Sequence, residues 1–203
     1  MLDVYQRPYD EKRPVVCLDE TCRQLIGETR LPQPARPGQP ARIDYEYVRN
    51  GVADVFMCFE PLAALRFVKV TKTRTKTDFA QCLKDLSDTV YPHADTIVLV
   101  MDNLNTHSLA SLYTAFSPEE ARRLAMRFEI HHTPKHASWL DMAEIEIGVM
   151  SRQCLARRIP TFEEMTSQVQ AWAADRNAHK GTVNWHFSTQ DARIKLRRLY
   201  PKI

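Results

Sequence analysis

An unbroken run of five apolar residues, Ile97 to Met101, ends directly at Asp102. A run without alternating polar residues is typical of a central strand that is covered on both faces. A second apolar stretch, Val15 to Leu18, ends in the same way at Asp19 and predicts a short buried strand. A carboxylate beside a buried strand is costly unless a cation balances it. The two stretches therefore predict a covered sheet with acidic groups at the ends of its strands.

Strand and helix patterns alternate along the rest of the chain. Val52 to Phe59 and Arg66 to Thr71 predict an antiparallel pair, and Phe128 to His131 predicts one more strand. Capping residues and helical spacing predict further helices, which are expected to begin near Asp78, Ser117, Ser138, Thr161 and Ser188, the third of them running to about Arg157. This order predicts an α/β fold: a mixed sheet flanked by helices, with extra helices at the C-terminal end.

Composition narrows the class of protein. The chain has 203 residues, of which 44% are hydrophobic and 26% charged, as in a globular domain. No apolar run approaches the ~18 residues of a membrane span, and residues 1–13 lack the apolar core of a signal peptide. Five cysteines without C-x-x-C spacing argue against a disulfide framework and a zinc finger, so we expect a reducing cytoplasm. Residues 31–42 contain four prolines and predict an extended loop inside the domain.

Charge is unevenly distributed. Residues 151–203 hold ten Lys and Arg residues against four Asp and Glu residues, whereas the first 150 residues are net acidic. An acidic body with a basic end suits a protein that gathers carboxylates at one site and approaches a polyanion with another face. A solvated helical surface accounts for the same pattern.

A third acidic residue, Glu144, lies in an otherwise apolar helical stretch from Trp139 to Ile147. If Asp19, Asp102 and Glu144 converge, their mutual repulsion requires a divalent cation. Mg²⁺ prefers such oxygen ligands, and two ions can activate an attacking oxygen and stabilise a leaving one in phosphodiester chemistry. Taken singly, each acid is equally explained as a surface carboxylate or a helix cap.

Three sequence blocks in this order resemble those of DDE transposases, in the bacterial insertion-sequence branch of the mariner superfamily. The blocks are Val16 to Glu20, Val98 to His107 and Thr133 to Ile145, and the ending from Trp185 to Pro201 is also similar. The resemblance implies a ribonuclease H-like fold and DNA strand cleavage and strand transfer in transposition. It implies two Mg²⁺ or Mn²⁺ ions held by the catalytic acids Asp19, Asp102 and Glu144.

The resemblance also implies a layout and partners. Residues 1–13 are a linker-like segment and residues 14–203 the catalytic domain, in which 159–203 form a basic helical part. The partners are transposon-end and target DNA, with a homodimer in the active complex, no membrane and no small-molecule cofactor. We expect the protein in the bacterial cytoplasm, associated with the nucleoid. The residues expected to contact DNA are Lys72, Arg74, Lys76, His107, Lys135, His136 and Arg152.

Three departures from the family pattern qualify the resemblance. Forty-one residues separate Asp102 from Glu144, more than in mariner relatives, and the excess near Ser117 is interpreted as a surface insertion. Asp141 stands where the family usually has Asn, and is either a fourth ligand or, as we favour, the cap of the helix that carries Glu144. The N-terminal DNA-binding domain of the relatives does not precede the catalytic blocks, which leaves open whether the chain acts alone.

Other residues allow alternative interpretations. Glu146 is a rival to Glu144 but lies about 200° around a helix from it, so only one of the two faces the strands. His131, His132 and His136 lie close together without a usual zinc spacing. Trp139 either stacks on a base or packs in the core. At the level of function, the alternatives are a truncated, non-catalytic remnant that binds DNA or a partner, and a nuclease that cuts without joining.

Overall fold

The computed structural model describes residues 2–104, 108–134, 137–183, 185–195 and 197. Five strands form one mixed sheet in the order β3-β2-β1-β4-β5. They are β1 (Val15–Glu28), β2 (Tyr47–Glu60), β3 (Leu65–Thr71), β4 (Ile97–Met101) and β5 (Phe128–His132). The first three strands are antiparallel neighbours, whereas β4 runs parallel to both β1 and β5. The predicted antiparallel pair and the predicted central strand are confirmed.

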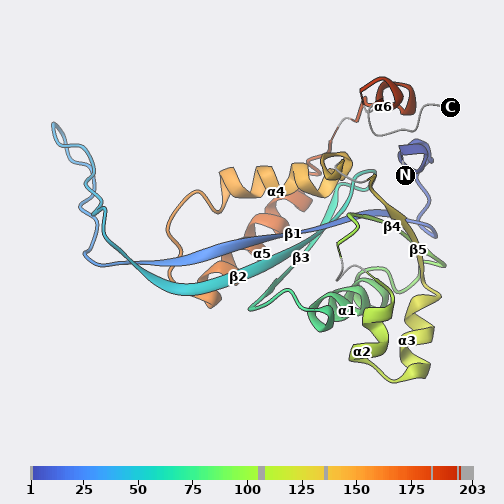
Figure 1. The fold of residues 1–203 in the computed structure, drawn as a ribbon. Helices are drawn as coiled ribbons and strands as arrows, with labels where there is room; N and C mark the ends of the chain where they lie inside the picture. The colour runs from blue at the N-terminus through green and yellow to red at the C-terminus, as the bar shows by residue number, and fades with distance from the viewer. Residues whose placement is uncertain (1, 105–107, 135–136, 184, 196, 198–203) are drawn as a thin grey trace.

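Helices cover both faces of the sheet, as predicted (Figure 1). One face packs against α4 (Met142–Gln153) and α5 (Phe162–Ala178), and the other against α1 (Lys76–Asp85), α2 (Ala110–Ala115) and α3 (Pro118–Ala125). Strand alternation sends Cys17 and Val100 into the first core and Leu18 and Met101 into the second. The shorter elements are η1 (Leu2–Gln6), η2 (Leu86–Val90), η3 (Ser138–Leu140) and α6 (Thr189–Lys195). None of the described helices is long and apolar enough to cross a membrane.

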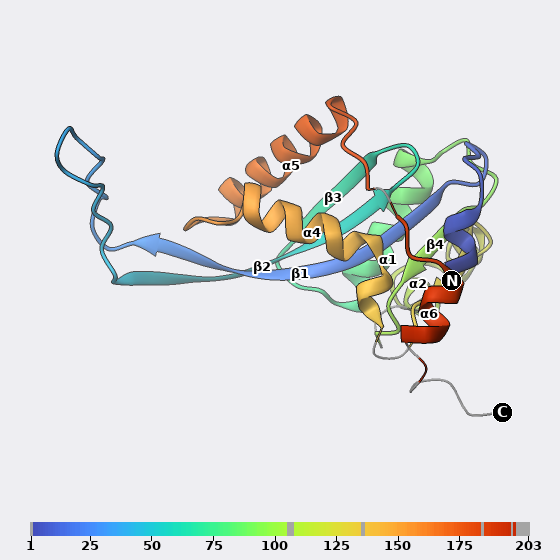
Figure 2. The ribbon, with the colours of Figure 1, turned by 90° about the horizontal axis from the view of Figure 1, so that it is seen from above.

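A long hairpin arm projects from the body where β1 and β2 continue beyond the sheet (Figure 2). Residues 31–42 lie at its tip, where the isolated bridges Gln33–Arg42 and Arg36–Gln39 close the loop. A β-bulge interrupts the ladder near Gln24 and Ile26, opposite Gly51. Gly51 has a φ of 94°, a conformation that a residue with a side chain rarely adopts. The bulge therefore marks the point where the arm leaves the body.

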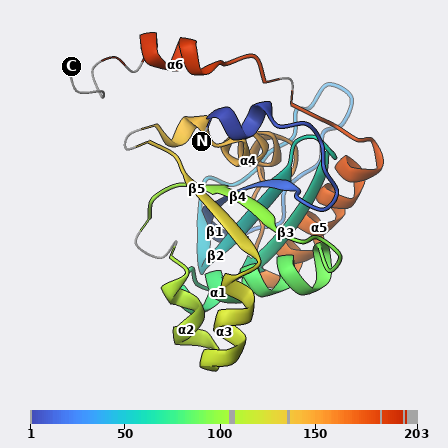
Figure 3. The same cartoon turned by 90° about the vertical axis from the view of Figure 1, so that its right-hand side faces the viewer.

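Helix α6, near the C-terminal end, lies apart from the sheet. Seen from the side of Figure 3, α6 and η1 lie close together at the margin of the molecule. The Thr189 hydroxyl donates to the Asp3 carboxylate at 2.8 Å, so the described ends of the chain are in contact.

One strand, one helix and one interpretation differ from the sequence expectation. β1 continues nine residues past Asp19, so Asp19 lies within the strand rather than at its end, because pairing with β2 maintains a segment that has no apolar pattern of its own. The helix that carries Glu144 begins at Met142, after the short 3-10 helix η3, and ends at Gln153, whereas the sequence predicted a helix from Ser138 to about Arg157. The interpretation of the Ser117 region as a surface insertion is wrong, since Ala121 and Leu124 of α3 are fully buried. α2 and α3 form the crossover that the parallel pair β4–β5 requires.

Candidate active site

The sheet brings Asp19 and Asp102 to neighbouring positions. Leu18 and Met101 are register partners on the parallel strands β1 and β4, and the two aspartates directly follow them. Strand alternation directs Asp19 to the same face as Cys17, which is the face covered by α4. The Asp19 carboxylate accepts a hydrogen bond from the Glu20 amide at 2.8 Å, and Asp102 accepts one from the Leu104 amide at 3.1 Å. Two of the three predicted acids therefore lie side by side.

Helix α4 supplies the third acid. It packs on β1 and β2, and Glu144 lies in its first turn (Figure 2). Burial, together with the negative charges of Glu20, Glu144 and Asp102, raises the pKa of Asp19 to about 7, against the opposing effect of the hydrogen bond from the Glu20 amide. The three predicted acids thus share one electrostatic environment, in which a proton or a cation is strongly favoured.

Asp141 is the N-cap of α4, as the sequence interpretation favoured. One carboxylate oxygen accepts a hydrogen bond from the Ala143 amide at 2.9 Å. The other oxygen, Oδ2, is buried and has no hydrogen-bond partner among the described residues. Burial holds the pKa of Asp141 well above its usual range, and the charges of Asp19, Glu144 and Asp102 add to the effect. Asp141 therefore caps the helix while adding a fourth carboxyl group to the site.

The donor set fits a divalent cation. It consists of hard carboxylate oxygens whose mutual repulsion a cation would relieve, and it includes the orphaned Oδ2 of Asp141. Within the described residues, however, no three His, Cys, Asp or Glu side chains are grouped closely enough to hold a metal ion. The assignment of Asp19, Asp102 and Glu144 as metal ligands and catalytic residues therefore stays a prediction.

Glu146, the rival of Glu144, is engaged elsewhere. Its side chain is fully buried and forms ion pairs with Arg66 at 2.8 Å and with Arg176 at 3.1 Å. The carboxylate is therefore committed to two guanidinium groups and is not available to the strand aspartates.

The predicted DNA contacts fall in several places. Lys72 and Arg74 follow β3, Lys76 begins α1, and Arg152 lies near the end of α4; all four side chains are exposed. The Lys72 ammonium lies 5.6 Å from the Phe162 ring, and Arg74 lies 4.0 Å from the Asp54 carboxylate. His107, Lys135 and His136 lie outside the described residues. The structure leaves the DNA-binding role of this whole set as a prediction.

The other sequence candidates have local partners. His131 pairs with Glu129 at 2.7 Å, and His132 contacts the Asp102 carbonyl oxygen at 3.1 Å, as expected for packing at a strand end. Trp139 is 37% exposed and packs edge-on against Phe187, with the Lys195 ammonium 4.9 Å from its ring.

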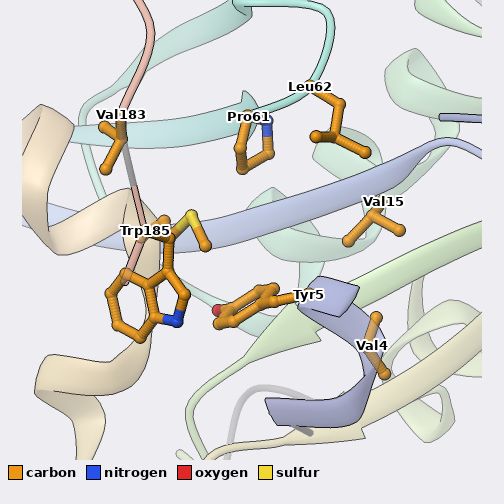
Figure 4. Close-up of a pocket in the computed structure, with 8 residues that line it drawn as sticks. Val4, Tyr5, Val15, Pro61, Leu62, Val183 and Trp185 are labelled. Atoms are coloured by element: carbon orange, nitrogen blue, oxygen red, sulfur yellow. The ribbon is translucent and has the colours of Figure 1, made fainter. Parts of the chain in front are cut away.

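Tyr5 is a site neighbour that the sequence did not indicate. Its hydroxyl donates to the Leu140 carbonyl oxygen at 2.9 Å, directly before the cap residue Asp141, and it accepts from the Cys17 thiol at 3.5 Å. Figure 4 shows Tyr5 facing Trp185 beside an apolar cavity of about 210 Å³, which Met142 also lines. The segment before β1 therefore packs against the start of α4.

Comparison with known proteins identifies the family. The family model described as "DDE superfamily endonuclease" matches residues 14–166, about three quarters of the chain. The chain belongs to this family. No curated protein matches it.

Solved structures of the Mos1 mariner transposase share the fold. The chain is 17% identical to the Mos1 paired-end complex with Mn (TM-score 0.53), 16% identical to the paired-end complex with left transposon end (0.56) and 17% identical to the strand transfer complex (0.55). Each match covers 88% of this chain and 54% of the Mos1 chain, so this domain spans about half of the relative's length. The predicted ribonuclease H-like fold is confirmed.

Proposed function

We propose that this chain is a transposase catalytic domain that cleaves DNA strands and transfers them with the help of divalent metal ions. The observation that carries the proposal is the placement of Asp19 and Asp102 on adjacent parallel strands beneath the helix that carries Glu144. Membership of the DDE superfamily endonucleases supports the same chemistry.

The three acids would hold two Mg²⁺ or Mn²⁺ ions. Bound ions would supply Lewis-acid activation of the attacking oxygen and stabilisation of the leaving oxygen. The chain itself contributes the arrangement: β1 and β4 fix the two aspartates, and the Asp141 cap fixes the first turn of α4. The raised pKa of Asp19 shows how strongly this environment favours a positive charge. One of the Mos1 structures of the same fold is described with Mn, which supports the choice of cation.

DNA and a second copy of the chain are the proposed partners. The Mos1 complexes of the same fold are described with transposon ends and with strand transfer, which supports a DNA partner. The exposed cations Lys72, Arg74, Lys76 and Arg152 suit phosphate contacts that depend little on sequence. For the homodimer, support comes from the arm, where Leu31, Ile43 and Tyr45 are 92%, 64% and 85% exposed. Apolar side chains gathered on a projecting arm suit a protein partner.

The test combines metal binding with DNA cleavage by the purified chain. Mn²⁺ binding is measured by electron paramagnetic resonance, and nicking of supercoiled plasmid is measured with Mn²⁺ and with EDTA. We expect Asp19→Asn, Asp102→Asn and Glu144→Gln each to weaken Mn²⁺ binding at least tenfold and to reduce nicking about a hundredfold or more. Glu119→Gln, an exposed acid in the first turn of α3, is the matched control and should behave as the wild type.

Two results separate the alternatives. Nicking that survives all three substitutions contradicts the assignment of the site. A wild-type chain that binds DNA but neither binds Mn²⁺ nor nicks the plasmid is the non-catalytic remnant, which was the alternative interpretation of the sequence.

A further inference from the structure

Helix α4 has only a short apolar stripe to fix its rotation. Met142, Ala143 and Met150 are buried on the side that also carries Glu146, whereas Ile147 and Val149 are partly buried and Ile145 is 37% exposed. An amphipathic helix is oriented by its apolar stripe, and this sequence provides only a weak one. Since successive residues are 100° apart, a modest rotation would move Glu144 away from the strand aspartates.

A buried ionic cluster holds the side of α4 that lies opposite Glu144. Glu146 and Arg66 have side chains with no exposed surface, and they meet at 2.8 Å through the Arg66 Nε. Arg176 of α5 donates to the other Glu146 oxygen at 3.1 Å. Glu146 lies about 200° around α4 from Glu144, so the cluster and the candidate active site hold opposite sides of one helical turn.

Arg66 is held in place independently of α4. Arg66 Nη1 donates to the Ala64 carbonyl oxygen at 2.9 Å, Nη2 donates to the Gly181 carbonyl oxygen, and the guanidinium lies 4.5 Å from the Phe59 ring. The Arg66 backbone exchanges two hydrogen bonds with the Asn177 side chain, at 2.8 and 2.9 Å. Arg66 of β3 and Arg176 of α5 together bind the Glu146 carboxylate, and we call this pair of arginines the socket.

Space around the socket is also tight. A Cβ added at Gly181 would lie 2.8 Å from the Arg176 guanidinium. A side chain at this position would therefore require the end of the Arg176 side chain to shift.

We infer that Arg66, Glu146 and Arg176 are positioning residues that fix the rotation of α4 and so hold Glu144 against Asp19 and Asp102. The inference rests on the proposed function, because it assigns the cluster a role toward those three acids. Buried ion pairs contribute little net stability compared with apolar replacements, but in some proteins they specify one arrangement among several. Here the arrangement specified is the face that α4 presents to β1 and β4.

The test replaces the ion pair with apolar side chains of similar size in the full chain. We expect the double variant Arg66→Met with Glu146→Leu to keep its melting temperature within a few degrees, because the two fully buried charges are removed together and Arg176, which loses its partner, is 23% exposed to solvent. Its Mn²⁺ affinity should fall at least tenfold, and its crystal structure should show α4 rotated. The matched control removes Lys69 and Asp85, an ion pair at 2.5 Å on the opposite face of the same strand (Lys69→Met with Asp85→Leu), and should leave Mn²⁺ affinity unchanged.

A double variant with wild-type Mn²⁺ affinity and an unrotated α4 overturns the inference. If the double variant does not fold, Arg176→Gln decides the question, since it removes the second ion pair of Glu146 without altering α4. We expect Arg176→Gln to weaken Mn²⁺ binding several-fold, and unchanged binding overturns the inference. Wild type and Asp19→Asn are measured alongside: if Mn²⁺ binding does not depend on Asp19, the proposed function fails, whereas an unrotated α4 with Asp19-dependent binding rejects only the positioning role.

Discussion

Ionisation of Asp19 lowers the stability of the protein when no metal ion is bound. Burial and three neighbouring carboxylates raise its pKa from a usual value near 3.8 to about 7. The folded state therefore binds the Asp19 proton more tightly than the unfolded state does. The contribution of Asp19 to stability consequently falls as the pH rises from about 4 to about 7 and then levels off.

Asp19→Asn should remove this cost. In EDTA, we expect the variant and the wild type to have similar stabilities near pH 3, where the carboxyl group is largely protonated in both states. At pH 8 the variant should be more stable by the order of 2–4 kcal/mol, since each unit of pKa shift corresponds to about 1.4 kcal/mol. Thermal melts at a series of pH values measure the difference. A difference that does not vary with pH contradicts the origin assigned to it.

Residues with local signals were predictable from the sequence, and those with only distant partners were not. Asp19 and Asp102 each follow an apolar run, and the Asp141 cap precedes a helical stretch, so neighbouring residues indicated all three. Arg66, Arg176 and Tyr5 contact partners 80, 30 and 135 positions away. The one hint was Arg66 itself, a charged residue between the apolar Leu65 and Phe67.

At the scale of elements, the crossover between β4 and β5 shows that the number of residues between Asp102 and Glu144 does not by itself predict the structure between them. The long interval between Asp102 and Glu144 suggested a surface insertion, but α3 buries Ala121 and Leu124 against the sheet. Only the three-dimensional packing distinguishes an added loop from a longer crossover. For strand β1 the sequence predicted too short an element. The outer half of this strand is held by hydrogen bonds to β2 and carries no apolar signal.

Leu124→Ala should therefore destabilise the whole domain. The side chain is fully buried, and truncation of a buried leucine costs about 2–5 kcal/mol through lost burial and a residual cavity. Met126→Ala is the control, because that side chain is 74% exposed and only two residues away. Chemical denaturation monitored by tryptophan fluorescence compares the two variants. Equal, small losses would support the insertion interpretation after all.

At the scale of the molecule, the arm is separable from the body. Glu28 and Tyr47 are register partners, so a two-residue Asn-Gly turn can replace residues 29–46 and close the hairpin. We expect the shortened chain to melt within a few degrees of the wild type, because the removed segment contains no buried residue. The proposed dimer should be lost, as measured by sedimentation. A shortened chain that still dimerises would place the dimer contact on the body.

The sheet order also determines when the site forms during folding. β1, β2 and β3 are consecutive antiparallel strands, whereas β4 joins β1 only after some eighty intervening residues have been brought back. Contacts of such long sequence separation carry a larger loop-closure cost and form slowly. A chain that has folded only its first three strands holds Asp19 alone, with neither Asp102 nor Glu144 near it. The acids meet only when the sheet is complete, so a partly folded chain lacks the assembled acidic site.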